Sequence, residues 1–375
     1  MSDLEGFLVV ALEQAVAAPY ASNLLAEAGA RVIKIERQEG DFARHYDSVV
    51  KGESAYFVWL NRGKESLCLD VKDTDDKALL IKILKKADVF IQNLKPRSVG
   101  KLGLDYETLK QINHNLVMCS ISGYGESGEF SEAKAYDLLV QAESGLTSVT
   151  GSELEPIRVG VSICDIATGQ AAYGAILRAL IARTKSGHGA HIETSLFGVM
   201  TDWMNVPLLH QKYTHQAPKR VGLMHPSIAP YGVFSTADGK QILISIQNER
   251  EWHVFCEQVL QLPALSSHPL FSCNIDRVTN RSKLDKIIDN YFLKIDLEQV
   301  CRYLKAADIA YGRLNDLETV LAHPQLRQIS VDSPSGRISL IASGTTVNGE
   351  RPSALAVPAI GQHSKSIRDE FSSNV

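Results

Sequence analysis

Residues 7–36, FLVVALEQAVAAPYASNLLAEAGARVIKIE, contain the pattern that decides the fold. Phe7–Leu12 is a short apolar run typical of a buried strand, and Arg31–Glu36 is a second run of this kind. Ala15–Ala28, between them, is rich in alanine and leucine and stops at Gly29, which predicts a helix. The stretch is therefore a strand–helix–strand unit, the building block of parallel α/β sheets.

The same alternation of apolar runs and helical patterns continues to about residue 204. We predict further strands at 67–71, 88–92, 116–121 and 191–194, and further helices at 77–86 and 166–183. Parallel strands in one sheet need crossover connections, which these helices supply. The sequence therefore predicts an α/β fold with a Rossmann-like, open and mostly parallel sheet.

The pattern loosens at residue 205, where several prolines and the basic pair Lys219–Arg220 interrupt it. Beyond it, two strand-like runs flank Ala-Asp-Gly-Lys as a hairpin, and three helical patterns follow. We expect the tail between Pro334 and Pro358 to form strand and to rejoin the large sheet. The predicted division is a large domain at 1–204, a linker at 205–230, a small α+β domain at 231–315 and a return to the large domain at 316–375.

Composition excludes several classes of protein. The chain has 375 residues, 45% of them apolar and 22% charged, which is ordinary for a globular protein. A net charge of −4 offers no basic surface in bulk, so we expect neither a nucleic-acid nor a membrane partner. Acids near Met1, scattered cysteines and the lack of a long apolar run lead us to expect a cytoplasmic protein with reduced thiols.

Glycine and histidine motifs give little support for a bound cofactor. Gly123–Gly128 matches G-x-G-x-x-G, but no helix opens directly after it, and a flexible glycine loop of another kind of site is the favoured interpretation. His188, His191 and Glu193 have no standard metal-ligand spacing and are interpreted as turn and surface groups. We therefore expect no metal and no prosthetic group.

Asp165 follows an apolar run and stands at the head of the predicted helix at 166–183. Its context allows two interpretations. Aspartate is a common N-cap, because its side chain accepts a backbone N–H. A carboxylate at a helix N-terminus among apolar neighbours is also suited to be a nucleophile, and the field of the helix would favour its ionised form.

Taken together, these segments resemble the class III coenzyme A transferases, the group that contains formyl-CoA and carnitine CoA-transferases. The similarity extends over nearly the whole chain. The segments that carry it are Gln14–Lys34, Asn61–Asp70, Ala87–Asn93, Ser122–Gly125, Ala135–Ala142 and Gly160–Gly169.

The resemblance implies an enzyme in which Asp165 is the nucleophile and Gln14, Tyr136 and Asp137 orient the reacting groups. It implies that coenzyme A binds as a substrate along Arg37, Leu69, Asn93, Leu94, Lys101 and Lys134. Lys101 and Lys134 are as readily explained as solvated surface lysines. The resemblance also implies an interlocked homodimer.

Two other functions are compatible with this superfamily. A 2-methylacyl-CoA racemase would need a histidine where Tyr136 stands, and a phenol is a poor general base at neutral pH. A CoA-binding paralogue without catalysis is disfavoured, because all four expected catalytic residues are present: Gln14, Tyr136, Asp137 and Asp165. We therefore expect CoA transfer through an aspartyl-CoA thioester.

The acceptor is expected to be a short dicarboxylic acid, with itaconate, mesaconate, citramalate, succinate or malate ahead of formate, oxalate or carnitine, and succinyl-CoA is the expected donor. Such an acceptor keeps one carboxylate charged inside the site, where it needs a cation. Arg220 and His225 lie in a segment that resembles the acceptor region of C4 and C5 dicarboxylate transferases. The glycine-rich lid of the formyl-CoA enzyme is not evident at 222–230.

Overall fold

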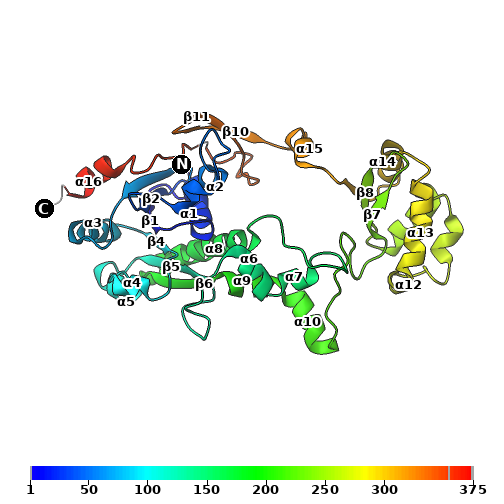
Figure 1. Ribbon diagram of the computed structural model, residues 1–375, viewed down its shortest axis with the longest axis horizontal. Helices are drawn as coiled ribbons and strands as arrows, with labels where there is room; N and C mark the ends of the chain where they lie inside the picture. Colours follow the sequence, from blue (N-terminus) through cyan, green and yellow to red (C-terminus); the bar gives the residue numbers. More distant parts are fainter. Residues whose placement is uncertain (1, 354, 373–375) are drawn as a thin grey trace. The chain divides into compact units, whose positions relative to one another are not determined.

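The computed structural model describes residues 2–353 and 355–372. The chain forms two compact units (Figure 1). The first contains residues 1–146, 158–206 and 327–375, and the second contains 147–157 and 207–326. The domain boundaries expected at 204, 230 and 315 stay a proposal, and residues 205–214 of the expected linker form helix α10.

A six-stranded sheet organises the first unit. Its strands are β1 (Leu8–Leu12), β2 (Arg31–Glu36), β3 (Lys64–Cys68), β4 (Val89–Gln92), β5 (Val117–Ser122) and β6 (Ala190–Ser195). The spatial order is β3-β2-β1-β4-β5-β6, and every neighbouring pair is parallel. The predicted α/β fold with a large parallel sheet is therefore confirmed. The strand order reverses between β1 and β4, the position at which open α/β sheets bind ligands.

Helices cover both faces of this sheet, which explains why its strands read as continuous apolar runs. Side chains alternate along β1: Val9 and Ala11 pack on one helical layer, and Val10 and Leu12 pack on the other. The first layer contains α1 (Ala17–Glu27), α6 (Asp137–Glu143), α8 (Ile163–Ser186) and α9 (Leu196–Trp203). The second contains α3 (Thr74–Leu84), α4 (Ser98–Lys101), α5 (Tyr106–Ile112) and α16 (Ser364–Ser372).

The tail strands β10 (Gln328–Ser333) and β11 (Gly336–Ile341) pair with each other and do not join the large sheet, so that expectation was wrong. The edge of β3 is already covered. The backbone N–H of Ser66 donates to Nδ1 of His363 (3.1 Å), and the N–H of Cys68 donates to Oγ of Ser364 (3.0 Å). These bonds leave no free edge for the tail strands, which instead pack on α2 (Ala55–Leu60).

The second unit contains the predicted hairpin, β7 (Tyr231–Ser235) and β8 (Gln241–Ser245), extended by β9 (Ala310–Arg313) into an antiparallel sheet. Its helical segments are α11 (Glu249–Val254), η2 (Phe255–Val259), η3 (Pro263–Ser267), α12 (Asn274–Thr279), α13 (Arg281–Phe292), α14 (Leu297–Ala306) and α15 (Leu317–Leu321). The remaining elements of the chain are η1 (Phe42–His45), α7 (Leu146–Val149) and α10 (Asn205–Thr214). Within the described residues, no helix has both the length and the apolar character needed to cross a membrane.

Gly169 provides a test of the close packing between α1 and α8. A Cβ added there would lie 2.6 Å from the carbonyl oxygen of Ala17 and 2.9 Å from Cδ1 of Tyr20. We expect Gly169→Ala to lower the free energy of unfolding by about 1–3 kcal/mol, because the two helices must move apart. Gly174 lies on the same helix, and a Cβ added there would meet nothing within 4 Å. Gly174→Ala is therefore the matched control, and we expect it to stabilise the chain by about 0.5–1 kcal/mol in urea unfolding. Equal losses in the two variants would contradict this account.

Candidate active site

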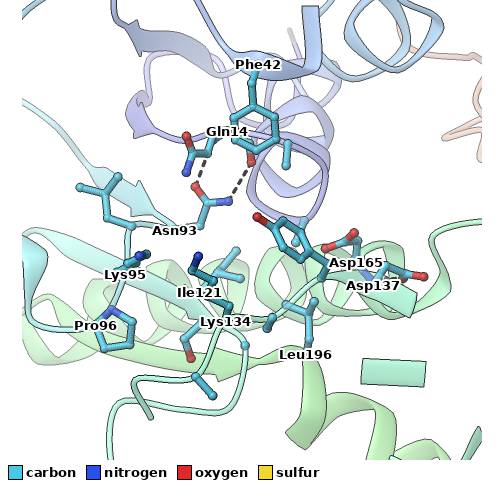
Figure 2. A pocket seen from close by; sticks show the side chains of 18 of the residues that line it. Gln14, Phe42, Asn93, Lys95, Pro96, Ile121, Lys134, Asp137, Asp165 and Leu196 are labelled. Carbon is cyan, nitrogen blue, oxygen red and sulfur yellow. Dashed lines mark hydrogen bonds between the residues drawn. The ribbon is translucent and has the colours of Figure 1, made fainter. Parts of the chain in front are cut away.

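A pocket of about 360 Å³ lies at the carboxyl ends of β1, β4 and β5 (Figure 2). Gln14 follows β1, Asn93 follows β4 and Gly123 follows β5, and all three line it. Tyr136, Asp137 and Asp165 line it as well. The pocket therefore occupies the edge of the sheet where the strand order reverses.

The structure brings together seven of the residues predicted from sequence: Gln14, Asn93, Leu94, Lys134, Tyr136, Asp137 and Asp165. Arg37, Leu69 and Lys101 belong to the same unit but do not line this pocket. Arg220 and His225 belong to the second unit.

Phe42, Tyr46 and Lys95 also line the pocket and were missed. Lys95 directly follows the predicted pair Asn93–Leu94, so its place in that loop was a usable signal. Phe42 and Tyr46 lie in and after a short 3-10 helix, and no periodic pattern marks them.

Asp165 is not the N-cap of its helix. Helix α8 begins at Ile163, Ser162 occupies the N-cap position, and Asp165 is the third residue of the helix. The capping bonds come from Asp137, whose Oδ1 accepts the backbone N–H groups of Cys164 (2.7 Å) and Asp165 (3.2 Å). The N-cap interpretation of Asp165 was therefore wrong. Among the described residues, the Asp165 carboxyl has no hydrogen-bond partner within the protein.

The environment of Asp165 makes its ionised form costly. Burial, and next the negative charge of Asp137, raise the pKa of Asp165 to about 7. The expectation that the helix N-terminus favours an ionised Asp165 therefore fails, because Asp137 takes the N–H groups of the first turn. The Asp165 carboxyl therefore keeps its proton to a higher pH than an ordinary aspartate.

Two phenols differ in their surroundings at this pocket. Tyr136 precedes α6 and is 64% exposed. Tyr46 is 47% exposed, and its partial burial, followed by the charges of Asp41 and Asp165, raises the pKa of its phenol to about 12. Tyr46 is thus a neutral hydrogen-bond donor throughout the physiological range.

Positive charge on the pocket wall comes from the exposed side chains of Lys95 and Lys134. Their position suits the phosphates of a nucleotide-like ligand, which bind lysine as a point charge. No cluster of three or more potential metal ligands occurs in the part of the chain that the structure describes.

The segment of the second unit that contains Arg220 and His225 is held by internal contacts. Arg220 donates from Nε to the carbonyl oxygen of Ser152 (2.9 Å). The ring of His225 stacks on that of Tyr231, with 5.2 Å between centroids, and its Nδ1 accepts the N–H of Ser227 (3.2 Å). Both side chains are therefore oriented before any ligand binds.

Comparisons with known proteins agree with this architecture. A family model described as CoA-transferase family III matches residues 4–364. The chain is 33% identical over 375 residues to acetyl-CoA:oxalate CoA-transferase of Acetobacter aceti, covering 98% of this chain and 95% of that protein. It is 33% identical over 387 residues to succinate–glutarate CoA-transferase of Agrobacterium fabrum, with the same coverage. A solved CAIB/BAIF family protein from Brucella suis matches with a TM-score of 0.86 at 31% identity, covering 99% of both chains.

The raised pKa of Asp165 predicts how stability depends on pH. The folded chain keeps this proton up to about pH 7, whereas an aspartate in the unfolded chain has its ordinary pKa of 3.8. Between these two pH values the folded state therefore binds more protons than the unfolded state. Stability contributed by the protonated group is therefore lost as pH rises from about 4 to 7. Asp165→Asn cannot ionise and avoids this loss. We expect the free energy of unfolding of the variant, relative to the wild type, to increase over this range and to level off above about pH 8. Urea unfolding at several pH values measures it, and a difference that falls as pH rises would contradict the assignment.

Proposed function

The chain belongs to CoA-transferase family III, and we propose that it moves coenzyme A from succinyl-CoA to a short dicarboxylic acid through a covalent intermediate on Asp165. One observation carries the proposal. Asp165 presents a carboxyl without a hydrogen-bond partner in the described protein to a pocket at the switch point of the sheet. Its raised pKa makes the carboxylate more basic than an ordinary aspartate and therefore a better nucleophile.

The proposed reaction begins when an oxygen of the Asp165 carboxylate attacks the carbonyl carbon of the donor thioester. The C–S bond breaks, CoA leaves as a thiolate, and a mixed anhydride remains. The thiolate then attacks the aspartyl carbonyl carbon, which releases the donor acid as a carboxylate and leaves an aspartyl-CoA thioester. The acceptor carboxylate repeats the two steps in reverse order and regenerates the free Asp165. The free energy of the donor thioester is conserved, because each thioester or anhydride bond that breaks is replaced by another thioester or anhydride bond.

Each addition to a carbonyl places negative charge on an oxygen that needs a hydrogen-bond donor. Gln14 lines the pocket, and its side-chain amide has no partner within the described protein. We assign its Nε2 to this role. Backbone N–H groups of the Gly123–Gly128 loop are further donors, but that of Gly125 is already bonded to Oγ of Ser122.

Asp137 positions the nucleophile in this mechanism. Its Oδ1 holds the first turn of α8, and its Oδ2 accepts from Nε2 of Gln141 (2.7 Å). Its charge is also a cause of the raised pKa of Asp165. We assign Tyr136, which lines the same pocket, to hydrogen bonding with the reacting groups.

We propose that coenzyme A binds along Arg37, Leu69, Leu94, Lys101, Lys134 and the backbone of Asn93, and Lys95 joins this set. Lys95 and Lys134 support the assignment because both reach the pocket that contains Asp165. The cations would meet the phosphates, where charge-assisted hydrogen bonds are strongest.

The dicarboxylic acceptor is supported by the name of the similar succinate–glutarate CoA-transferase, whereas the similar oxalate enzyme acts on an acid that the sequence does not favour. The carboxylate that does not react must be compensated by a cation and hydrogen bonds in a water-poor site. We assign this role to Arg220 and His225. Itaconate and mesaconate are the acceptors favoured by the sequence, and glutarate joins them.

We also propose a homodimer of interlocked chains. Large apolar side chains of the first unit, among them Leu139, Ile181 and Trp203, are more than half exposed. Soluble monomers rarely expose many large apolar side chains to water, so we infer that a second copy of the chain covers these groups.

Product analysis tests the proposed function. Succinyl-CoA is incubated with glutarate, itaconate, mesaconate, citramalate, malate, oxalate, formate or carnitine, and the esters are identified by mass spectrometry. We expect new CoA esters from dicarboxylates and none from Asp165→Ala, since the nucleophile is removed. Asp75→Ala removes an acid from the first turn of α3 and is the matched control, with full activity expected.

Three results would contradict the proposal. CoA transfer by Asp165→Ala would show that Asp165 is not the nucleophile. Deuterium uptake at the 2-position of an acyl-CoA without exchange of the ester would indicate racemisation. A clear preference for a monocarboxylate or for oxalate would contradict the proposed acceptor class. Arg220→Ala should raise the acceptor KM about tenfold or more, as expected for a lost hydrogen bond to a charged group, whereas Lys219→Ala should not.

The pH dependence of transfer tests the coupling between the two acids. We expect kcat/KM to rise with pH and to level off above about pH 7, because only the ionised Asp165 is nucleophilic. Asp137→Asn keeps an oxygen that accepts the N–H groups of α8 but removes the charge. The rise should therefore move to lower pH in this variant. A rise that stays in place or moves to higher pH would show that Asp137 does not set the pKa of Asp165.

A further inference from the structure

Asn93 makes a pair of hydrogen bonds to the backbone of Gln14. Its Oδ1 accepts the N–H of Gln14 (3.0 Å), and its Nδ2 donates to the carbonyl oxygen of Gln14 (2.8 Å) (Figure 2). Asn93 directly follows β4 and Gln14 lies two residues after β1, on neighbouring parallel strands. The side-chain amide therefore continues the hydrogen bonding of the sheet past the ends of both strands.

The next residue, Ala15, is held in a conformation that alanine rarely adopts. Its φ is +66°, in the left-handed region, which costs roughly 1–2 kcal/mol for a residue with a Cβ. Its N–H donates to Oδ1 of Asp41 (3.1 Å). Asp41 is itself fixed, because its Oδ2 accepts from the fully buried Nζ of Lys34 (2.8 Å).

Gln14 is therefore held on both sides. Asn93 fixes its own N–H and C=O, and Asp41 fixes the turn immediately after it. The turn separates β1 from α1, which begins at Ala17. A peptide restrained in this way has little freedom to rotate, so the direction in which the Gln14 Cα–Cβ bond leaves the backbone is set before substrate binds.

We propose that Asn93 is a positioning residue for Gln14, acting through the backbone of the β1–α1 turn, and that its side chain does not serve to bind coenzyme A. The inference rests on the proposed function, in which Gln14 donates to the developing oxyanion. Its consequence is specific. Loss of the Asn93 bonds should slow the chemical steps and leave the affinity for acyl-CoA nearly unchanged.

The test is a double-mutant cycle with succinyl-CoA and the best acceptor. Asn93→Asp keeps the size of the side chain and the acceptor for the Gln14 N–H, but sets a carboxylate oxygen against the Gln14 carbonyl oxygen. We expect kcat to fall about 10- to 100-fold, as for a catalytic group displaced by about 1 Å. The KM for succinyl-CoA should change by a much smaller factor. If Asn93 acts through Gln14, adding Asn93→Asp to Gln14→Ala should cost little more than Gln14→Ala alone.

Asn113 supplies a matched control at the opposite end of the sheet. Its Nδ2 donates to the carbonyl oxygens of Leu84 (3.0 Å) and Ala87 (2.8 Å), and its Oδ1 accepts the N–H of Asn115 (3.1 Å). Asn113→Asp thus disturbs a similar bridge far from the pocket, and we expect its kcat to stay at the wild-type level. Asn93→Ser serves as a second variant if Asn93→Asp does not fold.

Hydrogen exchange of the peptide over residues 8–16 gives a readout that does not depend on turnover. We expect faster exchange there in Asn93→Asp and unchanged exchange in Asn113→Asp. A raised KM with unchanged kcat would assign Asn93 to coenzyme A binding and overturn the proposal, as would additive losses in the cycle or unchanged exchange. A wild-type enzyme without transferase activity would refute the proposed function instead, and exchange alone would then decide whether Asn93 holds the turn.

Discussion

Four buried charges join β1, β2 and β3, and through Asp41 they hold the turn that carries Gln14 at the pocket. Lys34 contacts Asp41 (2.8 Å) and Glu13 (3.4 Å), Lys64 contacts Glu13 (2.7 Å), and none of these side chains is exposed. Burial opposes ionisation of Glu13, but Lys64 and Lys34 hold its pKa below the ordinary value. Removing one member would leave an uncompensated charge, at a cost of roughly 3–5 kcal/mol. The network ties β1, β2 and β3 to the loop that carries Asp41, and through Asp41 to the turn that carries Gln14.

The sequence allowed the large sheet to be predicted because strands buried on both faces are apolar throughout, and β2 was located to the residue. The prediction of β3 at 67–71 was displaced from the true strand at Lys64–Cys68 for the same reason. Lys64 and Ser66 are polar but buried, because they bond to Glu13 and Glu36. Their partners lie far away in sequence, so a hydrophobic pattern could not identify these positions as strand.

The site was predictable in part. Resemblance to known sequences selected Gln14, Asp137 and Asp165, which share one pocket. Local pattern failed for the cap of α8, because the carboxylate that caps it comes from Asp137, 28 residues before Asp165. A contact between distant segments leaves no local signal. The same limit explains why Tyr46 was missed, and why the bonds between Asn93 and Gln14 were not predicted.

The covering of β3 by His363 and Ser364 has a consequence for synthesis of the chain. The first unit begins at the N-terminus but needs residues 327–375 to be complete. A nascent chain therefore presents an uncovered strand edge from the time β3 emerges until about 300 more residues have been translated, and such edges template aggregation. The ribosome-bound intermediate thus faces a hazard that the finished chain does not, and molecular chaperones have their longest opportunity to act on it in that interval.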